Sequence, residues 1–293
     1  MNNDFHTYYL NSFDQKKIFF QTNFDPNESD LSKVIMLNYG LVCSNHHWSK
    51  QISYFHDLGY KMILHDYRGH FNSGGADDID SITFANMAKD MESILNFLNL
   101  KDVAMLGHSM GVNVTLEFAR TFPERLRSMV LIGGTVLPVT EVMFDSNVMD
   151  VVIPYVKTLF EKYPKEVEFI WKTSGKNPII QNVIMDGGFN ASKVSMEFIQ
   201  IYLNRIGQLS PDLFIKLFQE MTDHNIMSYL EEIETRTLVV GGEKDKVIPF
   251  NLQRLLKNKL KNSELYIVKN GSHVPQVDFP ELLNERFHFF LSQ

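Results

Sequence analysis

The sequence is poor in cysteine and has no long uninterrupted apolar segment. Cys43 is the single cysteine among 293 residues, so no intrachain disulfide is possible. Because no Cys and His residues stand at the spacing of metal ligands, we expect no metal site. No apolar run is long enough to cross a bilayer, so we expect no stable membrane insertion. Cys43 itself is expected to be a small loop or core residue.

Positive charge is also scarce. The 28 Lys and Arg residues against 35 Asp and Glu residues give a net charge of −7. Such a chain has no basic field to attract phosphate backbones, so nucleic acid is not an expected partner. The first residues, from Met1 to His6, lack the cationic start and apolar run of a signal peptide. The expected location is therefore the cytoplasm.

Most of the chain consists of apolar runs that alternate with helical patterns. A short hairpin is expected over residues 8–23, before the alternation begins. Buried β-branched runs separated by amphipathic helices predict a mostly parallel sheet covered by helices on both faces. The expected strands are 34–38, 61–65, 103–106, 128–132, 237–241 and 264–268, and the expected helices are 49–58, 84–98, 110–122, 251–260 and 280–291.

The alternation stops in the middle of the chain. Between residues 134 and 231 only helical patterns recur, over 155–163, 195–205 and 211–221. This pattern predicts a helical cap inserted after the sixth strand, with residues 1–133 and 232–293 forming the α/β core. Apolar cap residues are candidates for a pocket wall over the strand ends. These are Met143, Phe144, Met149, Phe160, Met185, Phe189, Met196, Phe198 and Phe214.

A G-x-S-x-G pattern follows the strand predicted at 103–106. In Gly107-His108-Ser109-Met110-Gly111, a strand candidate comes directly before and a helix candidate directly after. A turn this tight strains the serine backbone and leaves room only for glycine at the flanking positions. Ser109 is therefore the candidate nucleophile. The Met110 N–H, at a helix N-terminus, is a candidate oxyanion donor.

A serine hydroxyl needs a base with a pKa near neutrality, and His273 is the best-placed histidine. It follows the last predicted strand, at the sheet edge where active-site groups gather. An acid must orient the imidazole, and Asp245 and Glu243 both follow the preceding strand. We favour Asp245, because the extra residues before it let the loop turn back across the strand ends and its carboxylate is the shorter of the two. The order Ser, Asp, His is the order expected for this arrangement.

With these residues, the chain resembles the α/β-hydrolase superfamily, specifically its capped esterase, lipase and peptidase branch. Asn38-Tyr39-Gly40-Leu41, with Trp48 after it, is similar to that branch's His-Gly-x oxyanion loop. The resemblance implies that the Leu41 N–H is the second oxyanion donor. Asp66 to Ser73 resembles the family's structural D-x-R-G-x-G-x-S loop. Two departures are Tyr39 in place of a histidine and Phe71 in place of a glycine.

Three more histidines lie near these motifs. His46 and His47 lack a partnered carboxylate or third ligand at fitting spacing, so we interpret them as polar loop surface rather than metal ligands. His108, beside the nucleophile, is a packing or pocket-wall residue. Tyr39 is the other pocket-wall candidate.

The predicted activity is that of a serine hydrolase that cleaves an apolar acyl or aryl ester through an acyl-enzyme. The substrate would be a small molecule, and no cofactor is needed. C–C bond hydrolysis, aminopeptidase action and perhydrolysis use the same triad and stay open. A ligand-binding protein on a hydrolase scaffold is a further alternative from a different class.

Overall fold

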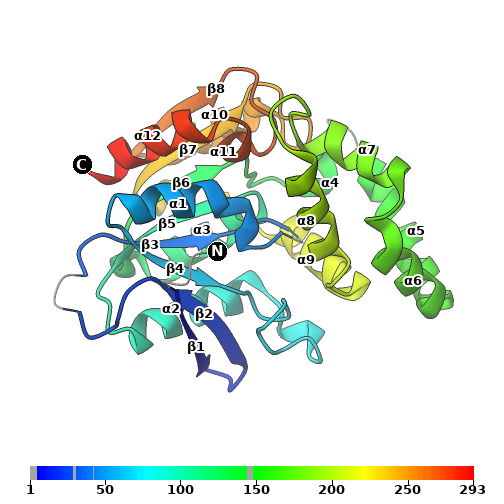
Figure 1. Ribbon diagram of the computed structural model, residues 1–293, viewed down its shortest axis with the longest axis horizontal. Helices are drawn as coiled ribbons and strands as arrows, with labels where there is room; N and C mark the ends of the chain where they lie inside the picture. Colours follow the sequence, from blue (N-terminus) through cyan, green and yellow to red (C-terminus); the bar gives the residue numbers. More distant parts are fainter. Residues whose placement is uncertain (1–4, 29–30, 42, 144–147) are drawn as a thin grey trace.

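A single mixed sheet lies at the centre of the computed structural model, which describes residues 5–28, 31–41, 43–143 and 148–293. Within these residues eight strands pair in the order β1-β2-β4-β3-β5-β6-β7-β8 (Figure 1). β1 and β2 form an antiparallel hairpin, β2 is antiparallel to β4, and the remaining pairs are parallel. The strands are β1 (His6–Asn11), β2 (Lys17–Thr22), β3 (Val34–Asn38), β4 (Lys61–His65), β5 (Val103–His108), β6 (Leu126–Ile132), β7 (Arg236–Gly242) and β8 (Ser263–Val268).

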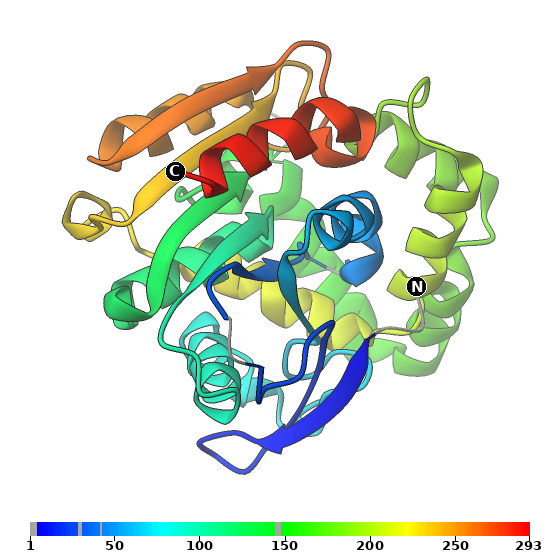
Figure 2. The same ribbon diagram turned by 60° about the vertical axis from the view of Figure 1, so that its left-hand side comes forward.

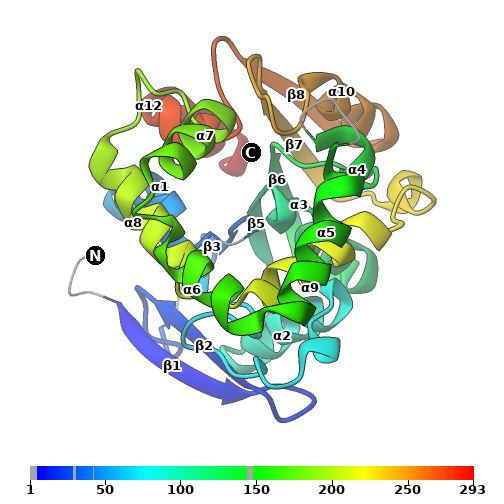
Figure 3. The same cartoon turned by 90° about the vertical axis from the view of Figure 1, so that its right-hand side faces the viewer.

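The central strands are apolar because both of their faces are covered. Every residue of β3 and β5 is buried, as expected for parallel strands between two helical layers. Helices α1 and α12 pack on one face, and α2, α3 and α10 pack on the other (Figures 1 and 3). In Figure 2 the hairpin β1–β2 lies at one edge of the sheet and β8 at the other. The predicted fold class is confirmed. These helices are α1 (Ser49–Asp57), α2 (Phe84–Phe97), α3 (Met110–Thr121), α10 (Phe250–Lys259) and α12 (Pro280–Leu291).

The stretch between β6 and β7 is helical and lies beyond the strand ends (Figure 3). Its last two long helices have serine N-caps, because the hydroxyls of Ser195 and Ser210 accept the backbone N–H groups of Phe198 and Leu213. No helix of the described residues is long and apolar enough to span a bilayer. The segments are α4 (Val139–Val142), α5 (Val148–Lys162), α6 (Pro164–Ser174), α7 (Pro178–Gly188), α8 (Met196–Ile206) and α9 (Pro211–Asp223). Short helices elsewhere are η1 (Asn45–Trp48), η2 (Ile79–Ser81), η3 (Pro123–Arg125), η5 (Leu230–Glu232) and α11 (Pro275–Asp278).

A buried polar contact joins the end of α9 to α3. The Asn113 amide donates to Nδ1 of His224 at 3.1 Å, so Nε2 of His224 carries the proton and donates to Glu117 at 3.3 Å. Arg120 also donates to Glu117. Burial alone would raise the pKa of the Glu117 carboxyl, but the hydrogen bonds from His224 and Arg120 lower that pKa to about 2.

We expect Glu117→Gln to destabilise the fold in a pH-dependent way. Because the folded-state pKa lies below the ordinary value of 4.5, the stabilisation is present at neutral pH and is lost as pH falls toward 2. The variant should lose on the order of 2 kcal/mol of unfolding free energy at pH 7, and this difference should shrink at pH 3. Urea denaturation at pH 7 and at pH 3 measures the unfolding free energy of both proteins. Glu197→Gln, which removes the same charge from an exposed site, should change little, and an equal deficit for Glu117→Gln at both pH values would refute the assignment.

Candidate active site

Ser109 lies in the turn between β5 and α3 with a strained backbone. Its φ of 54° and ψ of −122° fall in a region that side chains rarely adopt. A Cβ atom on Gly107 would lie 2.6 Å from the Gly111 carbonyl oxygen, and one on Gly111 would lie 2.2 Å from the Asn38 carbonyl oxygen. The two glycines therefore permit the close approach of β3, β5 and α3 that holds the serine in this conformation.

A buried hydrogen-bond network supports this turn from below. The Asn38 amide donates to the Thr115 hydroxyl at 2.9 Å, and that hydroxyl donates to the Gly111 carbonyl at 2.7 Å. The Asn38 amide oxygen also lies 2.9 Å from Nε2 of His65. Burial lowers the pKa of His65 to about 3, so this imidazole is neutral and Nε2–H is the donor. The network fixes the end of β3 against the first turn of α3.

Ser109, His273 and Asp245 form a continuous chain of hydrogen bonds. Nε2 of His273 lies 3.0 Å from the Ser109 hydroxyl oxygen, and Nδ1 of His273 lies 2.9 Å from Oδ2 of Asp245. All three side chains are buried. β5, β7 and β8 end at the same edge of the sheet, which is why residues far apart in the chain meet there.

Asp245, not Glu243, contacts the imidazole. Its other oxygen, Oδ1, accepts the backbone N–H groups of Val247 at 2.9 Å and Ile248 at 2.8 Å, which fixes the carboxylate. Glu243 instead accepts the Asn270 N–H at 3.0 Å and is exposed. The two carboxylates that the sequence left as alternatives thus point to different partners.

The His273 loop is anchored to α7 and α11. Asp278 accepts the Ser272 N–H at 2.7 Å and the Asn190 N–H at 3.3 Å. The Ser272 hydroxyl donates to the Gly188 carbonyl at 3.2 Å. These contacts couple the position of the imidazole to the helical segment above it.

Gly40 brings the loop after β3 against the serine. A Cβ on Gly40 would lie 2.9 Å from Cβ of Ser109, so the backbone of this loop runs directly beside the hydroxyl. Leu41 follows in the loop and lines the same cavity as Ser109. Met110 is the first residue of α3, where no helical carbonyl can pair with its N–H. Both predicted oxyanion donors therefore belong to segments that flank Ser109.

Tyr39 takes a structural role, which corrects its interpretation as a pocket-wall residue. Its side chain is fully buried and does not line the cavity. The Tyr39 hydroxyl accepts the Tyr67 N–H at 3.1 Å, and the Tyr67 hydroxyl donates to the Tyr39 carbonyl at 3.2 Å. These two hydrogen bonds fix the loop after β3. Tyr39 stands where the family that the sequence resembles has a histidine. The Tyr39 side chain points to the loop after β4 instead of the cavity.

The loop from Asp66 to Ser73 is held by a buried ion-pair network. The Arg68 guanidinium donates to Asp90 at 2.7 and 2.8 Å and to Asp14 at 2.9 Å. Phe71 has a φ of 37°, a left-handed conformation that glycine adopts more easily. The loop thus keeps the backbone turn of the motif even though Phe71 stands in the glycine position.

An apolar cavity of about 600 Å³ opens beside Ser109 and His273. Of the nine cap residues proposed from the sequence, Met143, Phe189 and Phe214 line it. Four of the others do not line it: Phe198 is buried elsewhere, Phe160 and Met185 are half-buried, and Met196 is exposed. Phe144 and the side chain of Met149 lie outside the described residues. Further lining residues include Leu159, Ile170, Trp171, Tyr202, Ile206, Phe218, Met221 and Val247.

His46 and His47 are not polar loop surface, which corrects the sequence interpretation. The side chain of His47 is buried, and its ring packs 5.5 Å from the Phe198 ring and 5.0 Å from the Tyr202 ring. His46 is half-buried, with its ring 4.6 Å from Phe198. Helix α8 covers the η1 turn, which sequence spacing does not reveal. His47, His108 and Cys43 all line the cavity.

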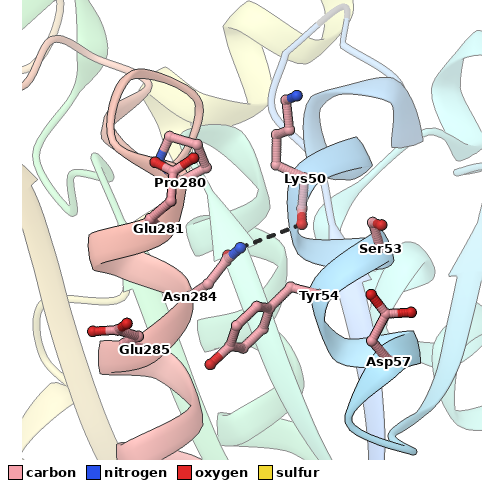
Figure 4. Close-up of a pocket in the computed structure, with 8 residues that line it drawn as sticks. All are labelled: Lys50, Ser53, Tyr54, Asp57, Pro280, Glu281, Asn284 and Glu285. Carbon is pink, nitrogen blue, oxygen red and sulfur yellow. Dashed lines mark hydrogen bonds between the residues drawn. The ribbon is translucent and has the colours of Figure 1, made fainter.

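A second hollow, of about 350 Å³, lies between α1 and α12 (Figure 4). Its side chains are mostly polar or charged, and the Asn284 amide donates to the Lys50 carbonyl at 3.3 Å. None of the triad residues lines it. Of the two hollows, the larger one is lined by Ser109 and His273.

The sequence is similar to a known protein family and to curated proteins. Residues 33–174 match a family model described as alpha/beta hydrolase fold. Human Protein ABHD8 is 24% identical over 260 residues, which are 88% of this chain and 55% of that protein, so the chain spans about half the length of this relative. The non-heme chloroperoxidase CPO-A1 of Kitasatospora aureofaciens is 26% identical over 253 residues, 82% of this chain and 84% of that protein.

A solved structure agrees over almost the whole chain. The esterase EaEST of Exiguobacterium antarcticum has a TM-score of 0.77 at 19% identity, covering 97% of this chain and 99% of the esterase chain. A TM-score of this size over nearly both whole chains shows that the two proteins share a fold. The chain therefore has the α/β-hydrolase fold.

Proposed function

We propose that this protein is a serine hydrolase that cleaves carboxylic esters with an apolar acyl or aryl group through an acyl-enzyme. The observation that carries this proposal is the hydrogen-bonded chain from Ser109 through His273 to Asp245 at the wall of an apolar cavity. A hydroxyl in contact with a buried, oriented imidazole is the arrangement that activates serine for attack on a carbonyl.

In the proposed mechanism His273 first acts as a base. Nε2 takes the proton from the Ser109 hydroxyl as Oγ attacks the substrate carbonyl carbon. Asp245 holds the Nδ1–H and stabilises the resulting imidazolium. His273 then donates its proton to the leaving alcohol, and the acyl group stays on Ser109 until water, activated by the same imidazole, releases it.

The charge on the carbonyl oxygen develops between two backbone N–H groups. Leu41 supplies one from the loop after β3, and Met110 supplies the other from the start of α3. The helix N-terminus favours the negative charge. Each donor of this kind lowers the barrier by about 3 kcal/mol.

Substrate choice is assigned to the helical cap, residues 134–231, which contributes most of the cavity wall. Among the described residues, no Asp, Glu, Lys or Arg side chain lines this cavity. Without a carboxylate, the cavity has no partner for the ammonium group of a peptide N-terminus. Without a cationic side chain, it has no partner for the carboxylates of a diacid. An uncharged ester with an apolar acyl or aryl group is the substrate class that fits best.

A substrate panel tests this reaction class. We expect p-nitrophenyl esters of short and medium acyl chains to be cleaved with a kcat/KM on the order of 10² times that for amino-acid p-nitroanilides or for a 1,5-diketone. Peracid formation from hydrogen peroxide and acetate is measured alongside. Faster cleavage of the anilide or the diketone, or peracid formation as the dominant activity, would replace the ester assignment. Turnover of none of them by folded protein would favour a ligand-binding role.

A further inference from the structure

Three side chains that the proposed reaction does not use meet in the wall of the catalytic cavity. Cys43 follows the loop after β3, His47 belongs to η1, and His108 ends β5. One sulfur or nitrogen atom from each lies within 4.8 Å of the others. The residues are 4%, 2% and 1% exposed, respectively. Residues that the sequence spacing did not group as metal ligands therefore lie close together in the structure.

The hydrogen bonds of His108 leave a lone pair free. Its Nε2 lies 3.0 Å from the His273 carbonyl oxygen, which only accepts, so Nε2 carries the proton. Nδ1 is then an unprotonated acceptor, and it is buried without a hydrogen-bond partner among the described residues. A metal-binding histidine commonly donates its second ring N–H to a carbonyl in this way.

His47 has two buried nitrogens without partners. Neither Nδ1 nor Nε2 has a hydrogen-bond partner within the described part of the chain. Burying a polar atom without a hydrogen-bond partner destabilises the folded protein. Most buried polar atoms in folded proteins therefore have such a partner. Stacking against Phe198 and Tyr202 explains a ring at this position but not two desolvated nitrogens, since phenylalanine would pack there without them. The free nitrogens of His47 and His108 therefore point to a ligand that accepts lone pairs.

We propose that Cys43, His47 and His108 bind a zinc-class divalent cation at the cavity wall. A thiolate with two neutral imidazoles is a donor set that suits Zn²⁺, and the cavity leaves a fourth position open to water. Binding forms a zinc–sulfur bond and releases the Cys43 thiol proton to solvent. Ligand atoms around tetrahedral zinc lie about 3.5 Å apart, so the three side chains close inward when the cation enters.

Occupancy of this site regulates the neighbouring triad. The cation shares a cavity wall with Ser109 and His273, and its charge opposes formation of the His273 imidazolium. This consequence rests on the proposed function, whereas cation binding itself does not. Zinc is therefore expected to inhibit ester hydrolysis reversibly, with recovery on addition of EDTA.

Cobalt titration of the full chain tests the binding site without relying on activity. Because the chain contains a single cysteine, any thiolate-to-cobalt charge-transfer absorption in reduced protein reports Cys43 alone. We expect this band to saturate at one Co²⁺ per chain and to disappear when Zn²⁺ displaces it. Cys43→Ser should abolish the band, and His47→Gln should weaken cobalt binding on the order of 10-fold or more.

His56→Gln is the matched control, because His56 lies beside Asp57 on α1, a typical place for adventitious binding. It should leave the band and its midpoint unchanged. Absence of a charge-transfer band from wild-type chain would overturn the proposal, and so would a band unaffected by His47→Gln. A saturable band in a chain that cleaves no ester would retain the cation site and reject the proposed function.

Discussion

Ser109→Ala is expected to lower kcat for p-nitrophenyl ester hydrolysis by about 10⁴-fold or more. The substitution removes the only atom that forms the acyl-enzyme and leaves His273 and Asp245 in place. Stopped assays at saturating ester measure the residual turnover, which would come from the oxyanion donors and binding alone.

The fold should tolerate this change. Alanine, like serine, has a Cβ at the strained φ of 54°, so the backbone cost is the same in both chains. Unfolding midpoints in urea should therefore agree closely. A folded Ser109→Ala protein that retains more than about a tenth of wild-type kcat would contradict the nucleophile assignment.

Asp245→Asn is expected to lower kcat on the order of 10³- to 10⁴-fold. An amide at this position donates as well as accepts, so it favours the wrong tautomer of His273 and no longer stabilises its cation. The side chain keeps its size, and an oxygen remains available for the N–H groups of Val247 and Ile248. The ester assay across a pH series separates this loss from unfolding.

Glu243→Gln is the control for Asp245→Asn. Glu243 carries the same charge on the same loop but accepts from Asn270, away from the imidazole. Its replacement should change kcat by less than about threefold. A larger loss for Glu243→Gln than for Asp245→Asn would reverse the assignment of the acid.

Strands and core helices were predictable because each depends on a local pattern. The apolar runs of β3 and β5 are buried on both faces, so composition alone marks them. The helical insertion was harder. α5 continues through Pro154, which commonly ends a helix, and α6 exposes Phe169 and Ile170 by 69% and 60%, which obscures its amphipathic period.

The triad contacts were predictable because strand ends place residues at a common edge. The choice between Asp245 and Glu243 depends on the turn that follows β7, where the Asp245 N–H donates to the Gly242 carbonyl at 3.3 Å. The wall of the cavity was not predictable from spacing. His47 and Cys43 become cavity residues because α8 closes over η1, and no local pattern encodes contact between those segments.

The most direct test of the central claim is fluorophosphonate labelling followed by intact-mass measurement. An activated serine attacks phosphorus, so we expect one adduct on the wild-type chain and none on Ser109→Ala or His273→Ala. Circular dichroism of each protein establishes that it is folded. Folded wild-type chain without an adduct, or an adduct that persists in Ser109→Ala, would contradict the claim that Ser109 is an activated nucleophile.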